Sequence, residues 1–238
     1  MKPILFAVAA FIAISAAVAA DRARPEELDK WMANYYAGPR PDEVATALRA
    51  VENQGLFEND DVQAPLSGFF AEIFRNNPNR IAEWIKPYRG VPNRHIIYSA
   101  LWMADSVESK AALESLAKAA SPEEAKRLRE LISSSPPTVA SMKIDSPASL
   151  DYLWGSFVAS GSGVPVLRVI DQMKRANTRG NINETLIGEA AQWSVSANAR
   201  QHSIVLQIVT AKAKTADPET KKILREILAG IEKDKAKK

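Results

Sequence analysis

Apolar side chains recur every three to four residues through most of this chain, and this spacing constrains the fold more than any other sequence feature. Ile97, Ala100, Leu101 and Ala104 occupy positions i, i+3, i+4 and i+7, which is the pattern of one buried helix face. We find no convincing run that alternates apolar and polar residues, as a strand would. Short helices are marginal on their own in water, so they must bury their apolar faces against one another. The sequence predicts an all-α protein.

Helix starts share a common pattern in which proline is followed by acidic residues. It occurs at Pro25-Glu26-Glu27, at Pro41-Asp42-Glu43 and at Asp217-Pro218-Glu219, and Ser121 to Glu124 adds a capping box. Proline suits the first helical turn, and acidic side chains suit the positive end of the helix dipole. Repeated starts and stops of this kind predict antiparallel helix pairs stacked as a compact α-α superhelix or solenoid, with TPR-like or HEAT-like geometry.

A Ser- and Pro-rich stretch, residues 133–138, cannot continue a helix and marks a boundary between two parts of the chain. We divide the sequence into a signal peptide (1–20), an N-terminal helical unit (21–135), a linker (136–148) and a C-terminal helical unit (149–238).

The two units show signs of an internal duplication. Residues 121–132 and 217–228 match at six of twelve positions with a spacing of 96 residues. Upstream, a spacing of 87 aligns Gly68 with Gly155. The alternative is that helix starts resemble one another by chance. A true duplication needs about nine extra residues in the second copy, and we expect part of them in the polar run 177–181.

The N-terminus has the features of an export signal. Lys2 precedes an unbroken apolar run from Ile4 to Ile14, and small residues follow up to Ala19 and Ala20. This pattern predicts cleavage by signal peptidase after one of those two alanines; the alternative is an uncleaved membrane anchor. We therefore expect an exported protein of the periplasm, or a secreted one. No later segment is apolar over a membrane-spanning length, so we expect no further transmembrane span.

Charge does not point to nucleic acid as a partner. Without residues 1–20 the chain carries 30 basic and 28 acidic side chains, a nearly neutral balance. The C-terminus is locally rich in lysine, at Lys233, Lys235, Lys237 and Lys238. Such an end is either a solvated helix terminus or a weak contact with anionic envelope components.

Recognisable catalytic and cofactor motifs are lacking. The chain has no cysteine and two histidines, so the sequence predicts no metal site and no cofactor. It contains no HExxH or GxSxG motif and no phosphate-binding loop. Gly161-Ser162-Gly163 resembles an anion-binding turn but fits a helix break.

A few side chains stay open as catalytic candidates. Neither His95 nor His202 has an acidic residue one helical turn later, but His202 has Ser203 and Ser196 nearby in sequence. Glu72 and Glu83 lie beside aromatic residues that could desolvate a carboxylate.

Adjacent acidic residues at the next helix start have a simpler explanation. Asp60 and Asp61 are expected to cap the helix that follows them. We name no catalytic residue.

Aromatic residues at helical spacing usually belong to a core, with one pair as the exception to consider. Trp31 and Tyr35 are separated by four residues in what we expect to be a terminal helix near a free edge. Terminal helices of repeat stacks need a polar face or a partner. We therefore assign these two residues to a candidate partner surface.

Two strings carry a family resemblance: residues 68–74, GFFAEIF, and residues 153–161, LWGSFVASG. They resemble segments of uncharacterised exported all-helical proteins of proteobacteria. The resemblance implies a bacterial periplasmic protein and carries no catalytic residue with it.

Three functions fit these observations, and the sequence leans towards the first. It is a non-enzymatic binding or scaffold protein that presents a helical groove to a peptide or protein. The second is an envelope hydrolase with a His- or Glu-based site in that groove, and the third is a binder of lipid or another small molecule between helices.

Overall fold

All regular secondary structure is helical over residues 25–236, the part of the chain that the computed structural model describes. The signal-peptide prediction, residues 1–20, lies outside this part. The prediction of an all-α fold is confirmed. The α-helices are α1 (Pro25–Ala33), α2 (Val44–Asn53), α3 (Asp60–Asn76), α4 (Ile81–Ile85), α5 (His95–Ala104), α6 (Val107–Ala119), α7 (Pro122–Ser133), α8 (Pro147–Ser160), α9 (Gly163–Ile170), α10 (Ile182–Gln201), α11 (Ser203–Thr215) and α12 (Pro218–Lys235).

Short 3₁₀ helices connect several of these elements. They are η2 (Tyr35–Ala37), η3 (Pro41–Glu43), η4 (Leu56–Glu58), η5 (Pro78–Arg80), η6 (Lys86–Tyr88) and η7 (Met173–Asn177). No helix in the described residues is both long enough and apolar enough to cross a bilayer.

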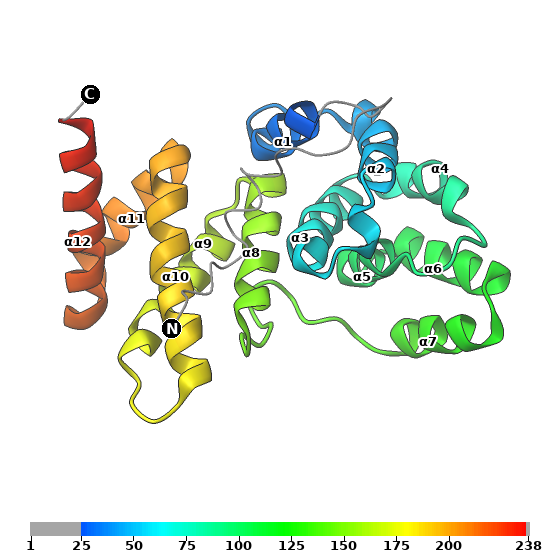
Figure 1. Ribbon diagram of the computed structural model, residues 1–238. Helices are drawn as coiled ribbons and strands as arrows, with labels where there is room; N and C mark the ends of the chain where they lie inside the picture. The colour runs from blue at the N-terminus through cyan, green and yellow to red at the C-terminus, as the bar shows by residue number, and fades with distance from the viewer. Residues whose placement is uncertain (1–24, 237–238) are drawn as a thin grey trace.

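Helices α3 and α8 form the centre of the molecule, and α2 and α4–α7 lie on one side of this pair with α9–α12 on the other (Figure 1). The two helices approach at a glycine from each. A Cβ atom on Gly68 would lie 2.1 Å from the carbonyl oxygen of Tyr152, and one on Gly155 would lie 2.0 Å from that of Pro65. Tyr152 precedes Gly155 by three residues, and Pro65 precedes Gly68 by three. The two helices therefore contact each other symmetrically at the crossing. Only glycine allows backbones to pack this closely.

The helices that follow α3 and α8 correspond in order and in the spacing of their first residues. α5 and α10 begin 87 residues apart, as Gly68 and Gly155 do. α6 and α11 each have 13 residues and begin 96 apart, and α7 and α12 each begin with proline 96 apart. The regular spacing of the helix starts, together with the equal lengths of α6 and α11, supports the internal duplication.

The extra residues of the second half lie in a helix rather than in a loop. α10 has 20 residues where α5 has 10, and the spacing between corresponding helices changes only after α10 begins. The expected location at residues 177–181 is therefore wrong. That polar run ends η7 and caps α10 through Asn181.

Aromatic side chains fill the interior around the central pair. Phe69, Phe70 and Phe74 of α3 are fully buried, as are Trp84 of α4 and Phe157 of α8. The large apolar area that these residues remove from water is the main source of stability in this region.

Candidate functional site

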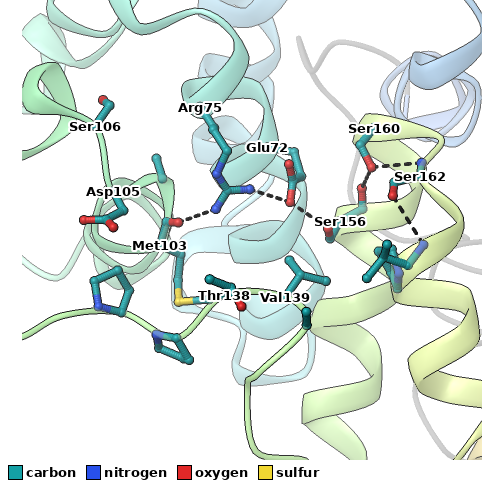
Figure 2. Close-up of a pocket in the computed structure, with 16 residues that line it drawn as sticks. Glu72, Arg75, Met103, Asp105, Ser106, Thr138, Val139, Ser156, Ser160 and Ser162 are labelled. Atoms are coloured by element: carbon teal, nitrogen blue, oxygen red, sulfur yellow. Dashed lines mark hydrogen bonds and ion pairs between the residues drawn. The ribbon is translucent and has the colours of Figure 1, made fainter.

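An open cleft of about 540 Å³ lies between the two halves of the molecule, and we call it the inter-unit cleft. Its walls come from the ends of α3, α5 and α8, from the starts of α6 and α9, and from the segment between α7 and α8 (Figure 2). The lining residues are Glu72, Arg75, Met103, Ala104, Asp105, Ser106, Pro136, Pro137, Thr138, Val139, Ala140, Ser156, Ser160, Ser162, Val164 and Pro165.

An ion pair between a buried carboxylate and a partly exposed guanidinium lines this cleft (Figure 2). Glu72 of α3 is 8% exposed, and its Oε1 lies 2.6 Å from the Arg75 guanidinium one turn later. The Ser156 hydroxyl of α8 donates to the same oxygen at 2.8 Å, and Arg75 donates to the Met103 carbonyl at the end of α5. Since a buried carboxylate is costly unless it is paired, these contacts explain how Glu72 is tolerated here. They also tie three helices together.

Serine residues shape the wall formed by α8 and α9. α8 ends at Gly161 in the left-handed conformation, with φ of 67°, so the chain turns sharply into α9. The Ser160 hydroxyl donates to the Ser156 carbonyl at 2.7 Å and accepts from the Ser162 backbone N–H at 3.2 Å. Ser162 caps α9 by accepting from the backbone N–H of Val164. The run 161–163 is thus a helix break with a cap.

The remaining wall is a non-helical segment, residues 135–141, which ends in a turn and which we call the strap. Within the described part of the chain, the hydrogen bonds of the strap stay inside it or reach Met142. Its ends are fixed, because Trp102 Nε1 donates to the Ser134 carbonyl and Arg168 donates to the Met142 carbonyl. The strap therefore covers the cleft while bonding little to it.

Trp31 and Tyr35 do not form an exposed partner surface, which corrects the sequence-based assignment. They are 7% and 3% exposed, and their rings pack edge-to-face with centroids 4.9 Å apart. Both also contact Phe69 of α3, at 5.7 and 5.5 Å. Trp31 lies in α1 and Tyr35 in η2 rather than in one helix, and both bury their rings against α3, so no free edge is left at these residues.

The two histidines lie in different halves and share no site. His202 precedes the first residue of α11, and its ring packs against those of Tyr36 and Phe157. Its Nδ1 lies 3.2 Å from the Tyr36 hydroxyl, and burial lowers the pKa of His202. Ser196, its candidate partner, instead accepts from Arg200.

His95 lines a second pocket, of about 500 Å³, between α5 and α7. Its ring packs against Tyr98 with centroids 6.0 Å apart, and Glu124 lies in the same pocket. The buried Glu124 carboxylate accepts from the Tyr98 hydroxyl at 2.9 Å and from the Asn93 backbone N–H at 3.0 Å. Both bonds end on Oε1 of Glu124, and they connect α7 to α5 and to the segment before it.

The other acidic candidates are structural. Asn59, rather than Asp60 or Asp61, caps α3 by accepting from the Asp61 backbone N–H at 3.0 Å, so the expected cap was misplaced by one residue. Glu83 is an exposed partner of Arg80. Within the described residues, His, Asp and Glu side chains form no group of three that could hold a metal ion.

Sequence reasoning missed the partners that complete the cleft. Arg75 and Ser156 were not singled out, because the residues that meet Glu72 include one that lies 84 positions away. It also missed Asp151 on α8, a partly buried carboxyl group whose pKa burial raises to about 7. Asp151 does not line the cleft.

A scan against protein-family models finds no match for this chain, and searches of curated proteins and of solved structures find none either. A function for this chain therefore has to be argued from the geometry of its own clefts and side chains.

Proposed function

We propose that this protein is a non-enzymatic binding protein of the bacterial envelope, and that the inter-unit cleft accepts a peptide or a segment of a protein partner. The observation that carries the proposal is the cleft itself, an open space of about 540 Å³ built from both halves and covered by a strap. This volume is typical of ligand sites, and sites between domains are common.

The chemistry of the cleft supports binding over hydrolysis. The contacts of Glu72 Oε1 with Arg75 and Ser156 tie three helices together, which gives this carboxylate a structural role in the wall of the cleft. Asp151 and His202, whose pKa values burial shifts, lie outside the cleft. A general acid or base must lie within hydrogen-bond reach of the reacting group, so Asp151 and His202 cannot act as one on a ligand in the cleft.

The alternatives fit less well. A lipid binder calls for a closed, wholly apolar cavity, whereas this cleft is open and has an ion pair in its wall. A hydrolase would have its best candidates in the pocket between α5 and α7, where His95 and Glu124 lie. Envelope localisation rests on the signal-like residues 1–20, and it places the partner among exported proteins or peptides.

Site-specific photo-crosslinking in living cells tests this proposal. A photoreactive amino acid replaces Val164, which lines the cleft and is 47% exposed. The control replaces Ile182, which is 80% exposed and lines neither the cleft nor the pockets beside α5 and α12. We expect one reproducible peptide or protein adduct from position 164 and none from position 182. Equal capture at the two positions, or none at 164, contradicts the proposal.

A further inference from the structure

The two sides of the α3–α8 pair differ in a way that singles out the cleft. Phe69 and Ser156 are equivalent by the 87-residue spacing that relates the central glycines. Phe69 is covered by the chain's own Trp31 and Tyr35, whereas Ser156 faces the cleft and bonds Glu72. In Figure 1, α1 lies above the central pair and the segment that contains the strap passes below it. One side is thus apolar and filled, and the equivalent side is polar and open.

From this difference we propose that the cleft recognises the free carboxyl terminus of a peptide, and that Arg75 holds the terminal carboxylate. The inference rests on the proposed binding function and names the class of ligand. Its basis is the bonding of Arg75, the neutralised acids around it, and the apolar wall beside it.

Arg75 has donors left for a ligand. A guanidinium carries five N–H groups, and the Glu72 carboxylate and the Met103 carbonyl engage one each. The Arg75 side chain lines the cleft and is 35% exposed. The two existing contacts hold the planar group in place, and a carboxylate can accept two parallel bonds from such a group.

The acidic side chains that line the cleft are each paired with a cation. Glu72 is neutralised by Arg75, and Asp105 lies 2.8 Å from the Lys110 ammonium. The cleft therefore offers no unpaired carboxylate, among its lining residues, to a peptide's amino terminus.

The apolar residues of the lining indicate which side chains should precede the terminal carboxylate of the peptide. Met103, Val139, Val164 and Pro165 line the cleft together with the polar groups. This combination suits a short segment with small apolar side chains next to its carboxylate, because the side chains leave water as the carboxylate is bound.

Isothermal titration calorimetry of the chain with residues 1–20 removed tests the inference with three probes. They are acetyl-Ala-Ala-Val as the free acid, the same peptide as the amide, and acetyl-Ala-Asp-amide, whose only carboxylate is a side chain. We expect the free acid to bind at least about ten times more tightly than the other two. Arg75→Gln should reduce its affinity to that of the amide, and Arg75→Lys should restore part of it. Arg80→Gln is the matched control, since Arg80 is 32% exposed and lies outside the cleft.

Arg75→Gln leaves Glu72 buried without its partner, so the double variant Glu72→Gln/Arg75→Gln serves where the single one unfolds. The comparison of acid with amide needs no variant. Equal binding of the three probes, or unchanged binding of the acid by a folded Arg75 variant, refutes carboxylate recognition but keeps a peptide-binding cleft. No binding of any probe also refutes it, and the crosslinking at position 164 then decides separately whether the binding function stands.

Discussion

At the residue scale, burial of an ionisable side chain makes the stability of this protein depend on pH. Asp151 is the clearest example, because burial raises the pKa of its carboxyl group to about 7. An acid whose pKa is raised in the folded state contributes stability below its unfolded pKa of about 3.9, and this contribution is lost as the pH rises through 7. Since the group is partly exposed, we discount the full conversion of the pKa shift and expect an effect of about 2 kcal/mol.

Asp151→Asn should therefore stabilise the protein at pH 8 by about 2 kcal/mol and leave its stability at about pH 4 nearly unchanged. Urea denaturation at the two pH values measures both effects. Asp145→Asn is a suitable control, because Asp145 is exposed. A stabilisation that is equal at the acidic and the alkaline pH would mean that the charge of Asp151 is not the cause.

Residue-scale contacts also mark the limit of sequence reasoning. Glu72 could be noted as a carboxylate beside aromatic residues, but Ser156 meets it only because α3 crosses α8. Trp31 and Tyr35 have the helical spacing that was recognised, yet spacing does not tell what covers a helix face. Side-chain partners distant in sequence leave no local pattern, so the ion pair in the cleft could not be predicted.

At the element scale, the crossing of α3 and α8 holds the two halves together. Its geometry depends on Gly68 and Gly155, each of which lies against the other helix's backbone. Backbone atoms cannot rotate away as a side chain can, so a methyl group at either position must separate the helices.

Gly68→Ala should therefore destabilise the protein by about 3 kcal/mol or more. The matched control is Gly38→Ala, where an added Cβ meets nothing within 4 Å. Chemical denaturation followed by circular dichroism measures both. Similar stabilities for the two variants would contradict the close crossing.

Within the described residues, the strap makes no hydrogen bond to the helices beside it. Its hydrogen bonds are internal, and it is held at the Ser134 and Met142 carbonyls. Amides with few protected bonds exchange readily with solvent. We expect residues 135–141 to exchange their amide hydrogens far faster than α3 and α8 when followed by mass spectrometry. Protection equal to that of α8 would show that the strap is a fixed wall rather than a cover.

Helix positions were largely readable from the sequence for a physical reason. Apolar periodicity, proline starts and glycine stops are local signals, and they placed the breaks near Gly161 and at the Ser- and Pro-rich segment before α8. The lengthening of α10 was not readable in this way. Extra turns within a helix continue its apolar periodicity, so no local signal marks the place where they were added.

At the scale of the whole molecule, two similar helical halves meet at one central pair and leave two equivalent surfaces. The N-terminal segment, α1 and η2, fills one of them with aromatic side chains. The other is the inter-unit cleft, which has a mixed polar and apolar lining and is the binding site that we propose. A binding site built from both halves ties recognition to the integrity of the whole fold.

Hydrogen exchange of the purified complex, once crosslinking has identified the partner, tests most directly whether the cleft is the binding site. Binding in the cleft should protect the strap, residues 135–141, together with the amides at the ends of α5 and α8 and the start of α9. Protection confined to the pocket between α5 and α7, or to the outer face of α12, would contradict this assignment, because the partner would then bind away from the inter-unit cleft.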